Sequence, residues 1–596
     1  MQYATIANMM KAKDVRKRFF DLLTQKYDHT VIPSASTIPE NDPSVLFTTA
    51  GMQPLVPYLT GKEHPQGTRL VDIQKCVRTG DIEEVGDNTH HTFFEMIGYW
   101  SLGDYEKVQT IEQTYTFMTD PEKGLGLDPA RMYVTCFIGN DDAPRDSESA
   151  EIWQKIGIPE SRIYFYEKEN WWSPGDNGPC GPDTEFFYDR TESGLGDMTQ
   201  EEFEIADEAQ QVVEICNNVF MSYEKKDGKV VGELPAKNVD MGGGLERIVS
   251  VVQGVESAFE TDLFLPVINM LQGYNDEIKT KDLRIIADHI RSSVVLMGDG
   301  VRPSNKDQGY VLRRLLRRAV RIADRYDITP EQISLLSQSV EEIYEGIYDL
   351  GDINEIKNEI KNEGEKFHKT LKRGMKEFEK KTQDKKLSGE DAFVLFTSYG
   401  FPIELIEEMV VEENISFDRV EYEKAFEAHQ ALSRKGAEQK FKGGLAGDGE
   451  METKYHTTTH LLHSALREVL GDHVGQKGSN ITSERLRFDF THDTKMTDEE
   501  KLEVTKLVND AIEAKLPVTQ QDMSYDDAMN KGSIGLFTDN YGDVVSVYTV
   551  GDEENPISRE LCGGPHVENT GGLGTFRIKK EEASSAGVRR IKAILS

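Results

Sequence analysis

Residues 89–105 read THHTFFEMIGYWSLGDY, and CVRTG precedes them at residues 76–80. Runs of the same apolar and aromatic kind recur at RMYVTCFIG (131–139) and VVEICNNVFMSY (212–223), between Gly- and Pro-rich turns. Short runs bounded by turn residues are typical of strands. Crossover helices do not separate these runs regularly, which favours antiparallel pairing. The first 275 residues therefore predict a mixed α/β domain built on an antiparallel sheet.

Beyond that domain the hydrophobic pattern changes twice. From residue 276 to residue 440 it becomes helical, as in LRIIADHIRSSVVLM (283–297). The glycine-rich segment 441–452 is typical of a linker. Residues 453–596 open with a helix at HTTTHLLHSALREVLG (456–471) and close with strands and Gly-rich turns. The whole chain is thus predicted to be an α+β multidomain protein.

The composition is ordinary for a folded protein, with 37% hydrophobic and 29% charged residues. No run approaches the ~18 apolar residues of a membrane-spanning helix, and the first residues lack the apolar segment of a secretory signal. Five scattered cysteines do not make a disulfide framework, so the sequence predicts a cytoplasmic protein without a membrane partner. The net charge of −36 argues against a wholly basic nucleic-acid binder, although phosphate binding depends on local charge.

Two pairs of residues near the C-terminus have the spacing of metal ligands. His456 and His460 are four residues apart on a predicted helix and so project from one face. Cys562 and His566 flank the Gly-Gly turn of LCGGPH, which can bring a thiolate and an imidazole together. These four side chains form a good zinc shell. An HxxxH pair alone is more often a surface or core pairing, but the second pair favours zinc. His463, one turn further on, is interpreted as a packed or exposed helix residue.

A second set of residues is spread through the predicted N-terminal domain. CVRTG supplies Arg78, the strand after it supplies aromatic side chains, and VDMGGGLERI (239–248) supplies glycines before a helix that carries Arg247. Aromatic side chains and turn residues also alternate in WWSPGDNGPCGPDTEFFYD (171–189), and EICNNVF (214–220) is a further apolar run. Core strands and ordinary turns explain each motif alone, and GGGLER is weak as a lone phosphate motif. Together, two separated arginines, aromatic faces and glycines before a helix can clamp a nucleotide bent over its phosphates.

The order of these motifs resembles that of the class II aminoacyl-tRNA synthetases, and their amino-acid sequences resemble those of the alanyl-tRNA synthetase family. PENDPSVLFTTAGMQ (39–53) resembles the first class II motif, CVRTG with HHTFFEMIG the second, and DMGGGLERI the third. RIIADHIRS (284–292), PSNKDQGYVLRRLLRRAVR (303–321) and YGFPIEL (399–405) resemble the helical tRNA-binding region of that family. The HTTTH and LCGGPH segments resemble its editing domain. The three predicted regions are therefore expected to be a class II catalytic domain, a helical tRNA-recognition domain and a zinc-binding editing domain.

The resemblance implies an ATP-dependent ligase that joins L-alanine to alanine tRNA through an alanyl-adenylate. Arg78 is implied to bind the α-phosphate and the alanine carboxylate, Arg247 the adenine and γ-phosphate end, and Asp240 the alanine ammonium; these three are the implied catalytic residues. One of Phe93 or Phe94 is implied to cover the adenine ring. The residues implied to contact ATP are Arg78, His91, Phe93, Phe94, Ile215, Cys216, Asn217, Gly242, Gly244 and Arg247. Those implied for the alanine pocket are Trp172, Asn217, Val219 and Asp240.

No protein nucleophile is implied for this reaction. The alanine carboxylate attacks the α-phosphorus in line, while Mg2+ and the arginines stabilise the charge that develops. A pocket for a methyl group rejects glycine by only ~1–3 kcal/mol and excludes serine poorly, so a hydrolytic second site is the physical remedy. Gln476 and Cys562 occupy the functional positions of the family's editing domain. A shell of four protein ligands is closed, which favours a zinc ion that orders this pocket over one that activates water.

A basic stretch interrupts the acidic chain. Residues 301–330 contain eight Lys or Arg against three Asp, and much of this charge falls at helical spacing. A solvated helix face is the ordinary explanation for such a run, but in a chain of net charge −36 contact with tRNA phosphates is favoured. The resemblance further implies that Asn305 reads a G·U pair of the acceptor stem, with Glu404 at the second reading position. The residues predicted to bind tRNA are Asn305, Arg313, Arg314, Arg317, Arg318, Arg321 and Glu404.

The sequence departs from the family pattern at four places. The segment between Arg78 and His90 is shorter than usual and lacks a lysine, so ATP or tRNA-end contacts are expected to differ. Glu404 stands where the family has aspartate. A β-barrel subdomain before His456 and the C-terminal dimerisation region after Ser596 are missing. With no sustained heptad seam in its place, the missing region predicts a monomer.

Three alternatives from other classes are weighed against this reading. A catalytically dead RNA-binding paralogue is disfavoured by the joint presence of Arg78, Asp240 and Arg247. A free-standing deacylase is disfavoured by the full set of class II motifs. A ligase for another amino acid is the third alternative. Alanine-dependent exchange of pyrophosphate into ATP distinguishes all three from an alanyl-tRNA synthetase.

Overall fold

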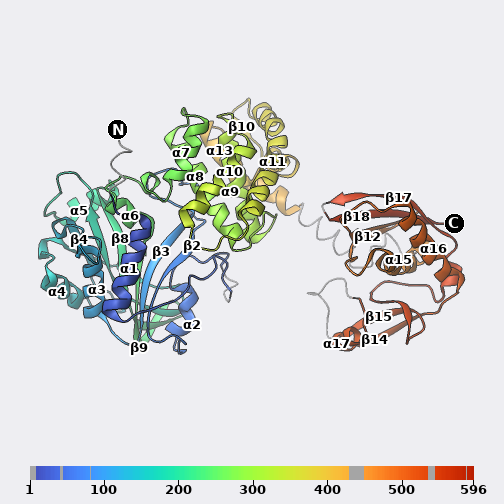
Figure 1. Cartoon of the computed structure of the whole chain (residues 1–596), viewed down its shortest axis with the longest axis horizontal. Coiled ribbons are helices and arrows are strands. Elements are labelled where there is room, and N and C mark those ends of the chain that lie inside the picture. The colour runs from blue at the N-terminus through green and yellow to red at the C-terminus, as the bar shows by residue number, and fades with distance from the viewer. Residues whose placement is uncertain (1–8, 41–44, 81, 429–448, 535–543, 586) are drawn as a thin grey trace. The chain divides into compact units, whose positions relative to one another are not determined.

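The computed structural model describes residues 9–40, 45–80, 82–428, 449–534, 544–585 and 587–596 (Figure 1). The chain forms two compact units, Met1–Asp418 and Arg419–Ser596. Most of the predicted linker, residues 441–448, lies outside the described residues. The boundaries that the sequence suggests between catalytic, helical and editing regions stay predictions. Within the described ranges, no helix combines the length and apolar character needed to cross a membrane.

The first unit is built on a large, mainly antiparallel sheet. Over the described residues its strands follow the order β1-β2-β3-β9-β8-β7-β4-β5, and β6 pairs with β7. Only the β1–β2 and β4–β5 pairs are parallel, so the predicted antiparallel sheet is confirmed. The strands are β1 (Thr30–Val31), β2 (Arg69–Val77), β3 (Phe93–Leu102), β4 (Met132–Phe137), β5 (Ile163–Tyr166), β6 (Trp171–Trp172), β7 (Gly178–Asp189), β8 (Val212–Lys226) and β9 (Lys229–Gly244).

The strand pleat divides this sheet into two faces. On β3, Phe93, Ile97 and Tyr99 point into the main hydrophobic core of the first unit. Phe94 and Met96 therefore point to the other face, where they line a cleft. The helices that accompany the sheet are α1 (Ala12–Tyr27), α2 (Val56–Leu59), α3 (Lys107–Thr119), α4 (Ser147–Ile156), α5 (Gln200–Glu208) and α6 (Leu245–Val252).

A group of helices follows the sheet along the chain (Figure 1). Its central helix, α8, is buried on nearly every side from Leu283 to Met297, because it packs against β3, α9 and α10. This is the helical region that the apolar periodicity predicts. Its elements are α7 (Leu265–Tyr274), α8 (Thr280–Gly298), α9 (Asp307–Asp324), α10 (Pro330–Tyr344), α11 (Ile353–Lys381), β10 (Lys386–Leu387), α12 (Gly389–Tyr399), α13 (Ile403–Glu412) and β11 (Ser416–Phe417).

The second unit contains two antiparallel sheets, with strand orders β12-β13-β18-β17 and β14-β15-β16 over the described residues. α15 and α16 pack on the first sheet, where Leu462, Phe488 and Val508 belong to one buried cluster. This confirms the predicted α+β character of the C-terminal region. Its elements are α15 (Glu450–Leu470), β12 (Gln476–Ile481), β13 (Leu486–Thr491), α16 (Asp498–Glu513), β14 (Val518–Ser524), α17 (Tyr525–Asn530), β15 (Val544–Gly551), β16 (Pro556–Leu561), β17 (Phe576–Ser585) and β18 (Val588–Leu595).

Candidate functional site

A cleft of about 200 Å3 opens on the face of the large sheet that carries Phe94. Strands β3, β8 and β9 and the start of α6 form it. Every residue predicted to contact ATP lines it except Phe93 and Cys216. The lining residues are Arg78, Thr89, His90, His91, Phe94, Met96, Glu214, Ile215, Asn217, Gly242, Gly243, Gly244, Glu246 and Arg247.

The three glycines at the end of β9 keep the floor of this cleft low. Gly242 lies opposite Asn217 on β8, and a side chain on it would rise toward the Met96 sulfur. Gly243 faces the other way, where an added Cβ would come within 2.8 Å of the Ile215 carbonyl oxygen. Only glycine permits that approach of β9 to β8. The run VDMGGGLERI thus builds a flat floor that leads directly into α6.

Two arginines and one aromatic ring border the cleft. The guanidinium of Arg78 lies 5.0 Å from the centroid of the Phe94 ring, and its Nε is 3.3 Å from the Thr49 carbonyl oxygen. Arg247, at the start of α6, places Nη1 3.0 Å from the Glu214 carboxylate. Both guanidiniums are partly exposed, so they are accessible to an anionic ligand.

Phe93 and Cys216 lie on the opposite face of the sheet. Both are essentially inaccessible to solvent and belong to the main core. Successive side chains of a strand alternate between its faces, so Phe93 and Phe94 cannot both reach the cleft. Phe94 is the ring that lines it, and the Cys216 side chain cannot line the cleft that Asn217 faces.

His91 is half-buried at the edge of the cleft, and both of its ring nitrogens are shielded from solvent. Its ring stacks on Phe264 with centroids 5.2 Å apart, and neither ring nitrogen has a hydrogen-bond partner within the described residues. Burial lowers the pKa of His91 to about 3, although Asp288 acts in the opposite direction. The imidazole is therefore neutral, with one donor and one acceptor free for a ligand.

Cross-strand register places the predicted alanine residues beside the nucleotide cleft. Asp240 on β9 pairs with Trp100 on β3 and Val219 on β8, and paired residues share a face. Asn217, two residues before Val219, faces the same side and lines the nucleotide cleft. Val219, Trp100 and the partly buried Trp172 belong to one apolar cluster. Burial in these surroundings raises the pKa of Asp240 to about 7.

Sequence reasoning missed the acidic residues of this face. Glu214 lines the cleft, and Glu185 and Asp183 on β7 lie opposite Asn217 and Val219. Burial, reinforced by the charge of Glu214, raises the pKa of Glu185 to about 9. Burial likewise raises the pKa of Asp183 to about 8. Two carboxylates spaced two residues apart inside an aromatic strand, GPDTEFFYD, were the available signal, since the pleat puts them on one face.

In the second unit, the predicted metal ligands come together. One ligand atom from each of His456, His460, Cys562 and His566 lies within 4.8 Å of every other. The Cys562 sulfur is 3.4 Å from Nε2 of His456 and 3.4 Å from Nε2 of His566. Ligands about 2.0–2.3 Å from a tetrahedral zinc ion lie roughly 3.3–3.8 Å apart, so the observed spacing fits zinc. Gly564 is required here, because an added Cβ would come within 2.4 Å of the His456 ring.

Outer contacts orient these imidazoles. Nδ1 of His456 is 3.0 Å from the Pro565 carbonyl oxygen, an acceptor only, so Nδ1 carries the proton and leaves the Nε2 lone pair for the centre. Nδ1 of His566 is 3.2 Å from the Thr457 hydroxyl. Burial would raise the pKa of the Cys562 thiol, but its contacts with the three histidines lower it to about 3. The sulfur is thus a thiolate, the form that binds metals.

His463 and Gln476 also lie in the second unit. His463 is fully buried, with Nδ1 3.1 Å from the Glu560 carboxylate, which is the position of a packed helix residue. Gln476 is half-buried at the first position of β12, and α15, which carries His456 and His460, packs against that strand.

Comparison with known proteins identifies the family of the chain. The family described as "tRNA synthetases class II (A)" matches residues 14–484, and the "Threonyl and Alanyl tRNA synthetase second additional domain" matches residues 545–592. The chain is 47% identical over 601 residues to the alanine–tRNA ligase of Borrelia hermsii, covering 98% of this chain and 100% of the relative. It is 50% identical over 600 residues to that of Treponema denticola, with 98% of each covered. The chain belongs to the alanine–tRNA ligase family.

Family membership confirms the class II catalytic fold and the additional domain that the sequence predicts. A longer member, the alanine–tRNA ligase of Staphylococcus epidermidis, is 35% identical over 712 residues, with 98% of this chain and 80% of the relative covered. The matched additional domain spans Cys562 and His566, so half of the candidate metal centre lies within it.

The basic stretch of this family member is placed differently from the open helix face that was expected. Arg318 and Arg321 on α9 are only 5% and 4% exposed. Arg318 Nη2 is 2.7 Å from Glu408, and Arg321 lies 3.1 Å from both Glu408 and Glu412 of α13. Acidic residues of α13 thus cover these two side chains, and their predicted contact with tRNA would require this cover to open.

The remaining arginines of α9 are partly exposed and also paired. Arg313 and Arg317 lie 3.0 and 2.6 Å from Glu363 on α11. Arg314 forms an ion pair with Glu83. Contact of these three with tRNA stays a prediction.

The two residues expected to read the acceptor stem both contact α9. The side-chain oxygen of Asn305 accepts a hydrogen bond from Arg313. The Glu404 carboxylate accepts one from the Tyr310 hydroxyl at 2.9 Å. Asn305 is exposed and Glu404 half-buried, so α9 holds both near its N-terminal half.

Proposed function

We propose that this protein activates L-alanine with ATP and transfers it to alanine tRNA, and that its second unit hydrolyses wrongly charged tRNA. One observation carries the first half. The nucleotide cleft, with Arg78, Phe94 and Arg247, shares a sheet face with the pocket around Asp240. If Asp240 binds the ammonium of alanine, the alanine carboxylate would therefore lie beside a phosphate held near Arg78. An in-line transfer needs this arrangement.

In this proposal each residue binds or orients. Arg78 and Arg247 hold the phosphates as cationic forks, and Phe94 supplies an aromatic face for the base. Asp240 binds the ammonium and so directs the alanine carboxylate toward the α-phosphorus. Mg2+ bound with ATP supplies further positive charge, and Glu214 is placed to hold it. Burial raises the pKa values of Glu185 and Asp183 beside the cleft, and a cation bound there would favour their ionised forms.

Pocket size supports the editing half. Val219, Trp100 and Trp172 give the surroundings of Asp240 an apolar wall suited to a methyl group. Such a wall separates alanine from glycine or serine by only about 1–3 kcal/mol, so a second hydrolytic site has a physical purpose. L-alanine and alanine tRNA are accordingly the proposed partners, with Asn305 and Glu404 as the proposed readers of the acceptor stem. The monomeric state and the cytoplasmic location also stay predictions.

Alanine-dependent exchange of pyrophosphate into ATP tests the activation step. We expect exchange with L-alanine to exceed exchange with glycine or serine by about 10- to 200-fold in kcat/KM, the range that one small group provides. Exchange that depends on another amino acid, or none at all, would reject the proposal. Omitting tRNA from the assay separates this step from transfer and editing.

The candidate metal centre gives a second prediction. Zinc, when bound, would order this pocket, with His456, His460, Cys562 and His566 as its ligands. We expect about one zinc per chain. Cys562→Ser should lower zinc content and slow deacylation of Ser-tRNA, while alanine-dependent exchange stays within about twofold because the centre lies in another unit.

Ser464→Ala is the matched control, since Ser464 lies on the same helix but bonds the Ile557 carbonyl oxygen outside the centre. Elemental analysis and hydrolysis of Ser-tRNA provide the measurements. Full zinc content in Cys562→Ser would contradict the ligand assignment. Undiminished deacylation by a zinc-free protein would contradict the role of the metal in the second site.

A further inference from the structure

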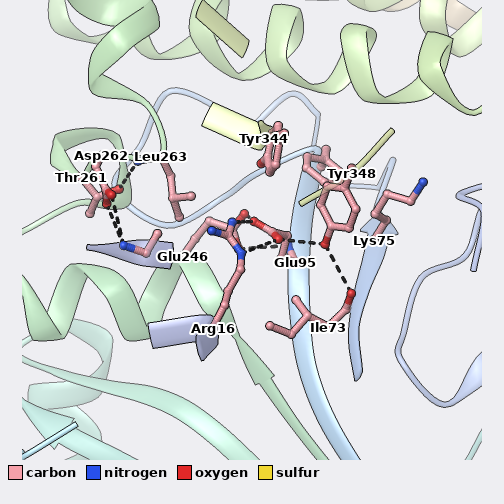
Figure 2. A network of polar contacts seen from close by, with 12 residues as sticks. Arg16, Ile73, Lys75, Glu95, Glu246, Thr261, Asp262, Leu263, Tyr344 and Tyr348 are labelled. Atoms are coloured by element: carbon pink, nitrogen blue, oxygen red, sulfur yellow. Dashed lines mark hydrogen bonds and ion pairs between the residues drawn. The ribbon is translucent and has the colours of Figure 1, made fainter. Parts of the chain in front are cut away.

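A network of buried ionic and polar side chains adjoins the nucleotide cleft, which Glu246 of this network also lines. Figure 2 shows Arg16, Glu95, Glu246, Tyr344 and Tyr348 of the network. The network joins four elements that are far apart along the chain. Arg16 comes from α1, Glu95 from β3, Glu246 from α6 and Arg291 from α8. All four are at least nine-tenths buried, and the two positive and two negative charges balance.

Arg291 is the centre of this network. Its Nη1 donates to the Phe93 carbonyl oxygen at 3.0 Å, its Nε donates to the Tyr344 hydroxyl at 2.8 Å, and its Nη2 donates to the Glu246 carboxylate. The guanidinium also lies 4.5 Å from the centroid of the Phe264 ring. A lysine could not make these contacts together, because it lacks the planar fork.

The two carboxylates of the network connect β3 to α6. The backbone N–H of Glu95 donates to the Glu246 carboxylate at 3.1 Å. Glu95 in turn accepts from Arg16 Nε at 3.0 Å and from the Tyr348 hydroxyl at 2.8 Å. The hydroxyl of Tyr348 also lies 3.3 Å from the Ile73 carbonyl oxygen on β2, as Figure 2 shows.

The residues of this network are direct neighbours, along the chain, of residues that line the cleft. Glu95 stands between Phe94 and Met96, which both line the cleft, and Glu246 stands directly before Arg247. Holding Glu95 against Glu246 therefore fixes the distance between the aromatic wall and the arginine of the cleft. The backbone N–H groups of Thr92 and Phe93 are held as well, by Asp288 at 2.9 Å and Ser292 at 3.1 Å on α8.

Stability alone is a weak reason for such an arrangement. Burying paired charges often contributes no more than apolar residues of the same volume would. Geometry is a stronger reason, because a displacement of about 1 Å in a reacting group can cost about 100-fold in rate. The network spans β2, β3, α6 and α8 and reaches the cleft only at Glu246, so Arg291 fixes the wall of the cleft without lining it.

We propose that Arg291 is a positioning residue for ATP: by binding Glu246 and the backbone of Phe93, it sets the separation of Phe94 and Arg247. This inference rests on the proposed function and extends it to residues outside the cleft. It assigns α8, the first long helix of the helical region, a part in nucleotide binding. Asp240, which is proposed to bind alanine, pairs with Trp100 at the other end of β3 from Phe93. Alanine binding is therefore expected to depend on Arg291 much less.

Arg291→Lys tests the proposal through the two substrates separately. We expect the KM for ATP to rise about tenfold or more in alanine-dependent exchange, while the KM for alanine changes by less than about threefold. Tyr344→Phe deletes only the hydroxyl that accepts the hydrogen bond from Arg291 Nε, so it should raise the KM for ATP by a smaller factor. Arg162→Lys is the matched control, since Arg162 likewise bonds a carboxylate (Asp197) and a backbone carbonyl oxygen (Ala130), outside the cleft.

Melting temperatures of all variants accompany the kinetics. A lower melting temperature with the KM for ATP unchanged would make the network merely structural and overturn the proposal. An equal rise in both KM values would overturn it too. Should Arg291→Lys not fold, Tyr344→Phe decides by the same comparison. Absence of exchange in the unmodified protein would instead reject the proposed function itself.

Discussion

Asp240→Ala should abolish alanine-dependent exchange. Asp240 is the buried carboxylate of the pocket that Val219, Trp100 and Trp172 surround, and a bound ammonium would need it as counter-ion. Removing one partner of a buried charge pair costs about 2–5 kcal/mol, which corresponds to roughly 30- to 5,000-fold in kcat/KM. Asp240→Asn should lose activity similarly, although it keeps the shape of the side chain. Its melting temperature should not fall, because an amide is cheaper to bury than a carboxylate.

The pKa of Asp240 adds a pH dependence to this prediction. Burial raises that pKa to about 7, so below pH 7 the empty pocket holds a neutral carboxyl group. Binding an ammonium then requires loss of that proton. The KM for alanine should therefore rise as pH falls below 7, by up to about tenfold per unit, and should level off above it. Exchange kinetics between pH 5.5 and 8.5 provide the measurement. Near-normal exchange by either variant would contradict the pocket assignment.

The sequence was sufficient to predict the parts of these sites that depend on local spacing. The interval between His456 and His460 is one helical turn, and the Gly-Gly turn brings Cys562 to His566. The glycines before Arg247 likewise predict a backbone that comes close to a ligand. Local geometry determines such features, so they do not require knowledge of the whole fold.

The sequence could not decide which face of a strand is the ligand face. The strand FFEMIGYW is apolar on both sides, since one face packs on the core and the other lines the cleft. Alternation shows that Phe93 and Phe94 point apart, but only the pairing of β3 with β9 shows which of them meets Arg247. Glu185 was missed for the same reason, because its neighbour Asn217 is brought beside it by sheet register.

The basic helix was misjudged because its partners are remote. Arg318 and Arg321 pair with Glu408 and Glu412, about ninety residues later in the chain. A charge run shows where cations lie on a helix, but a neighbouring helix determines whether they meet solvent. The acidic residues of α13 were visible in the sequence, yet nothing local showed that α13 lies against α9.

Arg321→Gln should therefore destabilise the protein rather than weaken tRNA binding directly. Arg321 is 4% exposed and donates to both Glu408 and Glu412, so its loss removes these partly buried hydrogen bonds. Glu408 still keeps Arg318 as a partner, and Glu412 keeps Arg325. We expect this loss to cost about 1.5–3 kcal/mol in the free energy of unfolding, the range for hydrogen bonds to charged groups. Arg325→Gln is the matched control: Arg325 also pairs with Glu412, but its side chain is 40% exposed, and an exposed pair contributes only about 0–1 kcal/mol.

Urea unfolding and the salt dependence of tRNA binding together distinguish a buried pair from a phosphate contact. A buried pair predicts a lower urea midpoint for Arg321→Gln. It also predicts that, in the folded Arg321→Gln protein, the slope of log K for tRNA binding against log salt concentration is unchanged. A phosphate contact predicts the reverse, with an unchanged midpoint and a slope smaller by about one. The second pattern would return Arg321 to the tRNA surface. It would also require α13 to move away from α9 when tRNA binds, since Glu408 and Glu412 form ion pairs with the Arg321 guanidinium in the free protein.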